Sequence, residues 1–269
     1  MRIWEAEHAI GVIVIVHGAG EHYGRYDWLI ERLNREHFHV VAGDLQGTGE
    51  TRGKRGHVDH FQQYIDTVHH WYKEAVAFEL PVFLFGHSMG GLAVIRMMME
   101  KQLPVRGVIL SSPCLALYDP PNKALTAAAK TMHRIVPGLS FKNGIRAEHA
   151  TRSPEVRTEF LKDELFVHTV SVRWYQELSK AMKVSLDHAY EFPNVSLLVL
   201  QAGEDYLVDK TAAHEWFNRL RIEDRAMREW RGLYHELFNE PEREEVFRFM
   251  LYFTWQRLVD FKLNEESVR

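Results

Sequence analysis

Ser88 lies in the segment G-H-S-M-G-G, which runs from Gly86 to Gly91 and could activate a hydroxyl group for nucleophilic attack. The apolar run 82–85 precedes this segment and a helical pattern follows it, which is the strand–turn–helix context of a nucleophile elbow. Glycines allow the strand and the helix to approach closely, and the beginning of a helix favours developing negative charge. We therefore predict that Ser88 is a nucleophile and that the backbone N–H of Met89 donates to the oxyanion.

A second oxyanion donor is predicted from the loop after an earlier strand. The β-branched run 10–16 ends in His17-Gly18-Ala19-Gly20. A loop of this kind supplies the other backbone donor in enzymes with a nucleophile elbow. Because Gly18 and Gly20 permit a tight path, the N–H of Ala19 is the expected donor.

A serine hydroxyl needs a base, and the base needs an acid to orient it. In enzymes with this elbow the acid follows the serine along the chain and the histidine comes last. The strand pattern 195–201 runs into Gly203-Glu204-Asp205, and we predict that Asp205 is the acid. Glu204 and Asp209 compete, but Glu204 should point elsewhere and Asp209 could cap a helix that begins near Lys210.

The predicted base is His235, in the segment G-L-Y-H-E after the last strand pattern. It is the only histidine after His214, and His214 falls inside a helical pattern, where a solvated position is expected. The other histidines precede Asp205, contrary to the expected order. His235 would take the Ser88 proton and later return it to the leaving alcohol.

The elements that must position these residues alternate between strand and helix along the chain, which predicts a mostly parallel central sheet with helices on both faces. The expected strands are 10–16, 38–42, 81–85, 105–110, 195–201 and 226–230, and the expected helices are 26–36, 61–78, 90–101, 168–190 and 241–261.

The segment between the strands 105–110 and 195–201 is too long for one crossover helix and contains no convincing strand pattern. We predict an inserted helical cap over residues 114–167, with the core formed by 1–113 and 168–269. The apolar residues of the first part of the cap could line an acyl-chain groove or form a small core of the cap: Leu117, Leu125, Ala128, Met132, Ile135, Val136 and Leu139. The lone Cys114 is either near the site or a small buried apolar residue.

Composition excludes several other classes of protein. The formal net charge is −4 and there is no basic block, so nucleic acid is not an expected partner. The single cysteine excludes an intrachain disulfide and a cysteine-based zinc cluster, and we expect no cofactor and no metal. No apolar run could span a bilayer, and the acidic N-terminus does not resemble a signal peptide. We expect a cytoplasmic protein, and nothing in the sequence indicates its oligomeric state.

Together these segments resemble the monoacylglycerol lipase and lysophospholipase group of α/β-hydrolases. The resemblance is carried by H-G-A-G-E-H-Y-G-R-Y (17–26), G-K-R-G-H-V (53–58), the elbow 86–91 and the segment 203–209. It implies an α/β-hydrolase fold with a mobile helical cap, a lipid-like monoester substrate, the triad Ser88, Asp205 and His235, and an oxyanion hole at Ala19 and Met89. One loop departs from the group's D-x-x-G-H-G-x-S pattern, because Thr48 and Thr51 replace its histidine and serine. We expect that loop, which begins at Asp44, to be structural.

Several functions remain in competition at this point. Monoacylglycerol lipase activity is the leading hypothesis, and lysophospholipase or general carboxylesterase activity is the alternative. An amidase or aminopeptidase would need cap carboxylates, but Glu155, Glu159, Asp163 and Glu164 have helical spacing and should be solvated. A non-catalytic binding protein would not require all three triad positions. The apolar cap residues also motivate the hypothesis of transient contact with a membrane surface.

Overall fold

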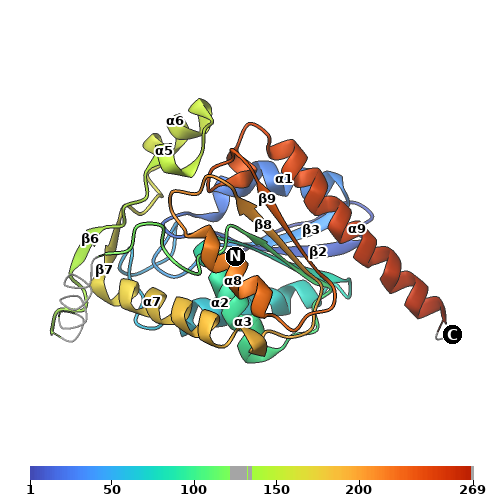
Figure 1. Cartoon of the computed structure of the whole chain (residues 1–269). Coiled ribbons are helices and arrows are strands. Elements are labelled where there is room, and N and C mark those ends of the chain that lie inside the picture. The colour runs from blue at the N-terminus through green and yellow to red at the C-terminus, as the bar shows by residue number, and fades with distance from the viewer. Residues whose placement is uncertain (122–131, 133–134, 268–269) are drawn as a thin grey trace.

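The computed structural model of the protein describes residues 1–121, 132 and 135–267. Its centre is a sheet of seven strands in the order β1-β3-β2-β4-β5-β8-β9, in which every pair is parallel except β1 with β3 (Figure 1). The strands are β1 (Arg2–Trp4), β2 (Gly11–Val16), β3 (Phe38–Ala42), β4 (Val82–His87), β5 (Gly107–Ser111), β8 (Leu197–Ala202) and β9 (Arg225–Trp230). The predicted mostly parallel α/β architecture is confirmed.

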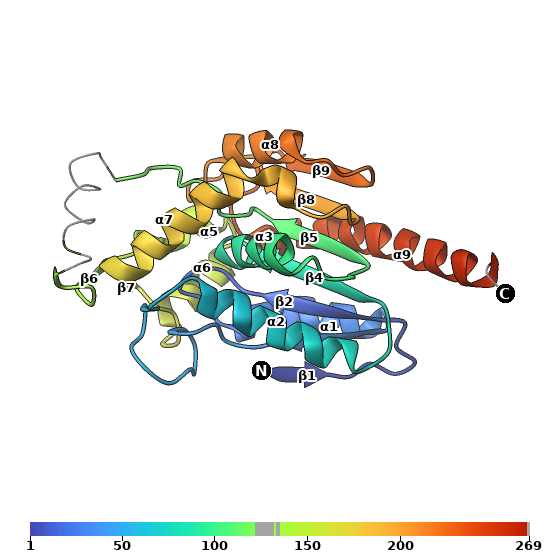
Figure 2. The same cartoon turned by 90° about the horizontal axis from the view of Figure 1, so that it is seen from below.

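Helices cover both faces of this sheet, as Figures 1 and 2 show. One face carries α2 (Gln62–Val76), α3 (Met89–Lys101), α7 (Val172–Asp187) and α8 (Lys210–Arg219), and the other carries α1 (Asp27–Arg35) and α9 (Arg243–Ser267). Successive side chains of β2 alternate between the two cores: Val12 and Val14 pack with the first group, and Ile13 and Ile15 with the second. Because both faces are covered, the central strands read as continuous apolar runs.

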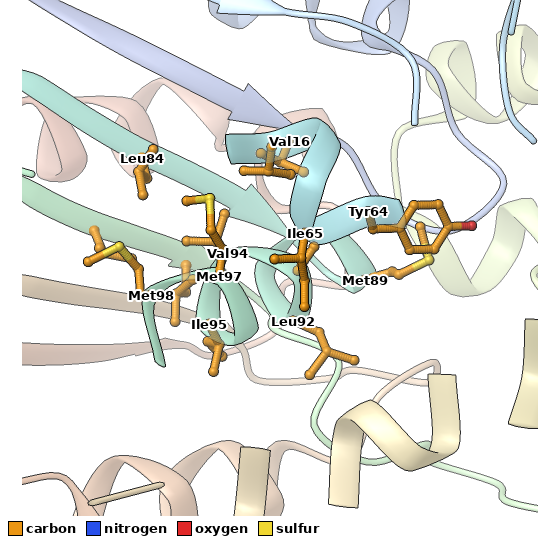
Figure 3. Close-up of a cluster of buried hydrophobic side chains, with 14 of the residues drawn as sticks. Val16, Tyr64, Ile65, Leu84, Met89, Leu92, Val94, Ile95, Met97 and Met98 are labelled. Atoms are coloured by element: carbon orange, nitrogen blue, oxygen red, sulfur yellow. The ribbon is translucent and has the colours of Figure 1, made fainter. Parts of the chain in front are cut away.

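The helix α3, which follows the predicted nucleophile, is buried along most of its length. Figure 3 shows its apolar side chains, with Leu92 and Met97 among them, between the sheet residues Val16 and Leu84 and residues of α2 such as Ile65. Burial of each large side chain contributes about 1.5–3 kcal/mol. The packing therefore fixes the N-terminal end of α3, where Ser88 precedes it, against the sheet.

The segment between β5 and β8 differs from the prediction, because it contains two short strands. Strands β6 (Ser140–Lys142) and β7 (Thr169–Ser171) pair antiparallel, with α5 (Ala147–Ala150) and α6 (Pro154–Lys162) between them. The expectation that no strand interrupts this region was wrong, since three-residue strands leave no readable alternation. The predicted Leu125 and Ala128 lie outside the described residues, and the division into core and cap at 114–167 stays a prediction.

The crossover helix α7 begins at Val172, four residues after the predicted start. Ser171 caps it, because its side chain accepts from Trp174 N. Short 3-10 helices lie at η1 (Tyr23–Tyr26), η2 (Ala189–Glu191) and η3 (Leu237–Asn239). Among the helices of the described residues, none combines the length and apolar character needed to cross a membrane.

Candidate active site

Ser88 lies at the turn between β4 and α3, as the sequence predicts for a nucleophile. Its backbone has φ 51° and ψ −120°, a conformation that costs energy for a residue with a side chain. The surrounding backbone holds it there: Ser88 N donates to Ser111 O at 2.9 Å, and Ser88 O accepts from Leu92 N and Cys114 N. The strained turn is therefore fixed on both sides by hydrogen bonds.

The glycines around Ser88 are required by close backbone approach. A Cβ at Gly90 would lie 2.2 Å from Val16 O, and one at Gly86 would lie 2.7 Å from the Cα of Gly91. Neither distance is compatible with a side chain, because the neighbours are backbone atoms. The elbow motif is thus explained by the crossing of α3 against β2 and β4.

Asp205 and His235 are brought together by the ends of β8 and β9. His235 Nδ1 lies 2.8 Å from Asp205 Oδ2, and both residues are buried. Asp205 Oδ1 accepts from Leu207 N and Val208 N at 2.9 Å each. Because an ionised carboxylate only accepts, Nδ1 carries the proton and Nε2 is left with a free lone pair. This is the tautomer that a base for a serine hydroxyl requires.

Charges around His235 tune its basicity. Burial alone would lower the pKa of His235, but the Asp205 carboxylate and its hydrogen bond outweigh burial, and Glu236 and Glu21 add to their effect. The pKa of His235 is therefore raised above its ordinary value. The neighbouring His87 ring, whose centroid lies 4.7 Å away, behaves oppositely, because burial lowers the pKa of His87 to about 4.

The residues that competed for these positions have other places. Glu204 is exposed, and Asp209 caps α8 by accepting from Thr211 N. His214 lies on α8, as expected, but its ring is half-buried against Glu229 at 3.0 Å instead of being fully solvated. None of the three contacts His235 through a hydrogen bond in the described part of the chain.

The predicted oxyanion loop lies directly against Ser88. A Cβ at Gly18 would lie 3.2 Å from the Cβ of Ser88, and both Gly18 and Ala19 line the cavity described below. Met89 is the first residue of α3, so its N–H has no intrahelical acceptor. The two backbone N–H groups proposed as oxyanion donors thus belong to segments that flank the same serine.

A buried charge network that the sequence did not predict lies behind this loop. Glu21 Oε2 accepts from Gly18 N and from Tyr26 Oη, both at 2.7 Å, and Arg25 donates to both carboxylate oxygens of Glu236 at 2.9 and 2.7 Å. Burial opposes ionisation of Glu21, but His87, Arg25 and Tyr26 outweigh it and lower the pKa of Glu21. The one feature of the sequence that could have indicated this network is the i, i+4 spacing of Glu21 and Arg25 within the motif 17–26.

Asp163 is part of the same region, contrary to the prediction that it is solvated. Its side chain is largely buried, and its Oδ2 lies 2.9 Å from His22 Nε2. Glu155, Glu159 and Glu164 are exposed, as predicted. The contacts of Asp163 with the motif 17–26 tie the end of α6 to the loop beside Ser88.

The loop that begins at Asp44 is held by its own hydrogen bonds, in agreement with a structural function. Asp44 accepts from Tyr23 N at 3.0 Å and from Glu50 N at 2.8 Å. Thr48 donates to Leu45 O at 2.7 Å and lies 3.2 Å from His17 Nε2. Thr48 therefore uses its hydroxyl group within the loop where the group's pattern has a histidine.

A cavity of about 530 Å³ opens onto Ser88 and His235. Much of its wall is apolar and comes from the segments on both sides of β6 and β7, from α7 and from the loop after β8: Leu117, Phe141, Val170, Trp174, Leu178 and Val208. Cys114 also lines the cavity, and burial raises the pKa of its thiol to about 12. Both expectations for this cysteine are therefore met, since it is buried and near the site.

The protein has clear relatives. The family described as "Serine aminopeptidase, S33" matches residues 7–242. Phospholipase YtpA of Bacillus subtilis is 49% identical over 95% of this chain and 99% of its own length. Monoglyceride lipase of Rattus norvegicus is 32% identical over 90% of this chain and 81% of its own length. The crystal structure of Paleococcus ferrophilus monoacylglycerol lipase has a TM-score of 0.84 at 32% identity, over 96% of this chain and 99% of that one.

These matches extend over both ends of the chain and over the region between β5 and β8. They agree with the mostly parallel sheet and with the elbow at the end of β4. The chain therefore belongs to the serine aminopeptidase S33 family of α/β-hydrolases, within the monoacylglycerol lipase and lysophospholipase group that its motifs predict.

Proposed function

We propose that this protein hydrolyses the carboxylic ester of single-chain lipids, with monoacylglycerol as the preferred substrate, through an acyl-enzyme on Ser88. The observation that carries the proposal is the cavity, in which an apolar wall meets Ser88 and His235. The apolar wall can bind a fatty acyl chain, and the polar groups of Ser88 and His235 can contact the ester group at the end of that chain.

The proposed reaction begins when His235 Nε2 removes the proton of the Ser88 hydroxyl. Ser88 Oγ then forms a bond to the ester carbonyl carbon, and the N–H groups of Ala19 and Met89 donate to the oxyanion. The oxyanion collapses, the bond to the alcohol breaks, and His235 gives its proton to the leaving oxygen. Asp205 keeps the imidazole in the required tautomer throughout.

Water completes the cycle by the same steps. His235 removes a proton from water as the water oxygen attacks the acyl carbonyl, and the proton returns to Ser88 Oγ when the fatty acid leaves. The raised pKa of His235 makes it a stronger base for both steps, provided that it is neutral at the start of each.

Lysophospholipid hydrolysis is the second candidate, because the relative with 49% identity is named a phospholipase. Amide hydrolysis, which the family's description suggests, has less support from the site. Two of the carboxylates in the cavity wall, Glu21 and Glu236, are buried and engaged by Arg25, so they are not free to bind a substrate amine, and the wall's Asp119 is exposed to solvent.

The test is hydrolysis of a matched set of substrates by the wild type and by Ser88→Ala. The set is monoacylglycerol, lysophosphatidylcholine, triacylglycerol and an aminoacyl amide. We expect the glycerol monoester to be preferred and its hydrolysis to be lost in Ser88→Ala. Preference for the lysophospholipid would change the assigned substrate but leave the proposed mechanism in place. Cleavage of the amide alone, or activity that survives in Ser88→Ala, would contradict the proposal.

We also propose that apolar residues before β6 contact the lipid surface from which the substrate comes. Ile135, Val136 and Leu139 are all exposed, and Ile135 is the most exposed at 73%. Leu117, a further candidate from the sequence, packs against the core and is therefore not a suitable probe. Figures 1 and 2 show β6 at the opposite end of the molecule from the last turns of α9.

The membrane proposal is tested by cosedimentation with phosphatidylcholine vesicles. We expect Ile135→Asp to reduce binding several-fold. The matched control is Val259→Asp on α9, which introduces the same charge at an exposed apolar position at the far end of the molecule. Equal binding by the wild type and by Ile135→Asp would refute contact through this segment.

A further inference from the structure

Arg25 is a buried cation at the centre of the charge network behind the proposed oxyanion loop. Its side chain is only 7% exposed, yet it faces three carboxylates. It donates to Glu236 at 2.9 and 2.7 Å, its Nε lies 3.5 Å from Glu21 Oε1, and its Nη1 lies 3.8 Å from Asp163 Oδ2. A buried cation requires such partners, because its desolvation is otherwise uncompensated.

Two of these carboxylates are attached to the catalytic loops. Glu236 directly follows His235 in the chain, and Glu21 accepts from Gly18 N, one residue before Ala19. The planar guanidinium contacts both, because its Nη2 donates to the two oxygens of Glu236 while its Nε lies beside Glu21. One side chain thus joins the loop of the proposed base to the loop of a proposed oxyanion donor.

Aromatic rings protect this junction from water. The Cζ of Arg25 lies 5.1 Å from the ring centroid of Phe160 and 5.8 Å from that of Phe166. Burial alone would lower the pKa of Arg25, but Glu236 and Glu21 raise it above its ordinary value, so the guanidinium remains charged. In this shielded position its ion pairs are screened far less than surface pairs.

We propose that Arg25 is a positioning residue, which holds the His235 loop through Glu236 and the Gly18–Ala19 loop through Glu21 in the relative arrangement that the reaction needs. The inference rests on the proposed function of Ser88, His235 and Ala19. It assigns Arg25 no contact with the substrate.

Arg25 also balances the charges that face His235. Those groups are Asp205 from the loop after β8, Glu236 from its own loop, Glu21 from the oxyanion loop and the His87 ring from β4. Glu236→Gln keeps the shape of the side chain but removes one negative charge, which leaves the guanidinium partly uncompensated. The pKa of His235 must then fall, because its protonated form loses a favourable neighbour.

Arg25→Lys makes the opposite change, because it keeps the charge of the side chain and alters its shape. A lysine keeps the positive charge, but its single ammonium nitrogen cannot reproduce the contacts that Nη2 makes with Glu236 and Nε makes with Glu21. The matched control is Arg32→Lys, because Arg32 also donates to a glutamate, Glu244, at 2.8 Å and lies 5.0 Å from an aromatic ring, that of Phe247. Arg32 lies on α1, outside the site.

The experiment measures the rate at which a fluorophosphonate labels Ser88, as a function of pH, together with kcat/KM for a p-nitrophenyl ester. The labelling rate depends on Ser88 and its base but not on which natural ester is cleaved. We expect Arg25→Lys to react about 10- to 100-fold more slowly with its acid limb unchanged, and Arg32→Lys to react like the wild type. For Glu236→Gln we expect the acid limb to move to lower pH by about half a unit or more.

A purely structural function of this network would leave the acid limb of Glu236→Gln in place. That result, or an Arg25→Lys variant as reactive as Arg32→Lys, would overturn the inference. If Arg25→Lys unfolds, the shape-preserving Glu236→Gln decides alone. Normal labelling of a wild type that cleaves no lipid ester would refute the proposed substrate and leave the test of Arg25 intact. A wild type whose Ser88 is not labelled would overturn both.

Discussion

Asp205→Asn is the sharpest test of Asp205 as the acid that orients His235, because the structure fixes the orientation of the new side chain. Oδ1 of Asp205 accepts from Leu207 N and Val208 N, so the oxygen of an asparagine must stay on that side. Its amide nitrogen then faces His235 Nδ1 and donates to it. The imidazole is forced into the tautomer with the proton on Nε2, which cannot accept the proton of Ser88.

The magnitude follows from what it costs to recover the active tautomer. The asparagine would have to turn over and leave two backbone donors without acceptors, each at about 1–3 kcal/mol. The total of roughly 2–6 kcal/mol corresponds to a loss of about 30-fold to 10⁴-fold in kcat/KM. Loss of the charge-assisted bond to His235 adds to this loss.

The assay is kcat/KM for a soluble p-nitrophenyl ester, with melting temperature as the measure of folding. Glu204→Gln and Asp209→Asn are the controls, since each removes one charge from the same loop, and both should remain within a few-fold of the wild type. A folded Asp205→Asn that kept most of its activity, or a control that lost activity in its place, would contradict the assignment of Asp205 as the acid.

Three further predictions concern pH, the elbow and the cavity. Because His235 must be neutral and its pKa is raised above the ordinary 6.5, kcat/KM should fall as pH decreases through a value above 6.5, and a plateau that continues below pH 6 would contradict this. Gly90→Ala should destabilise by more than about 4 kcal/mol in urea unfolding, because its Cβ would lie 2.2 Å from Val16 O, whereas Gly91→Ala, with its nearest contact at 3.1 Å, should cost far less. For p-nitrophenyl esters, kcat/KM should rise with acyl length by up to about four-fold per methylene, from roughly 0.8 kcal/mol each, until the cavity is filled. A flat profile would argue against an acyl-binding cavity.

The sequence predicted the central sheet, and the positions of the proposed triad residues at strand ends, because the signals for both are local. Strands such as β2 and β4 are buried on both faces and read as unbroken apolar runs. Ser88 carries its own motif, and Asp205 and His235 follow strand ends in a fixed order. Residues that need only a strand end to position them can be placed in the fold without a structure.

The charge network could not be predicted because it depends on contacts between distant segments. Arg25 and Glu236 are separated by 211 positions, and only the folded chain brings them together. Asp163 was misread for the same reason, since its helical spacing suggested a solvated face. The strands β6 and β7 are three residues each, too short for periodicity to distinguish them from loop.

The proposed mechanism requires that ester cleavage pass through an acyl-enzyme on Ser88. The most direct test is to quench the reaction of the protein with a monoacylglycerol in acid and to map the acyl group by peptide mass spectrometry. We expect an adduct of acyl mass on the peptide that contains Ser88, absent from Ser88→Ala. An adduct on another residue, such as Cys114, or turnover by Ser88→Ala, would contradict it.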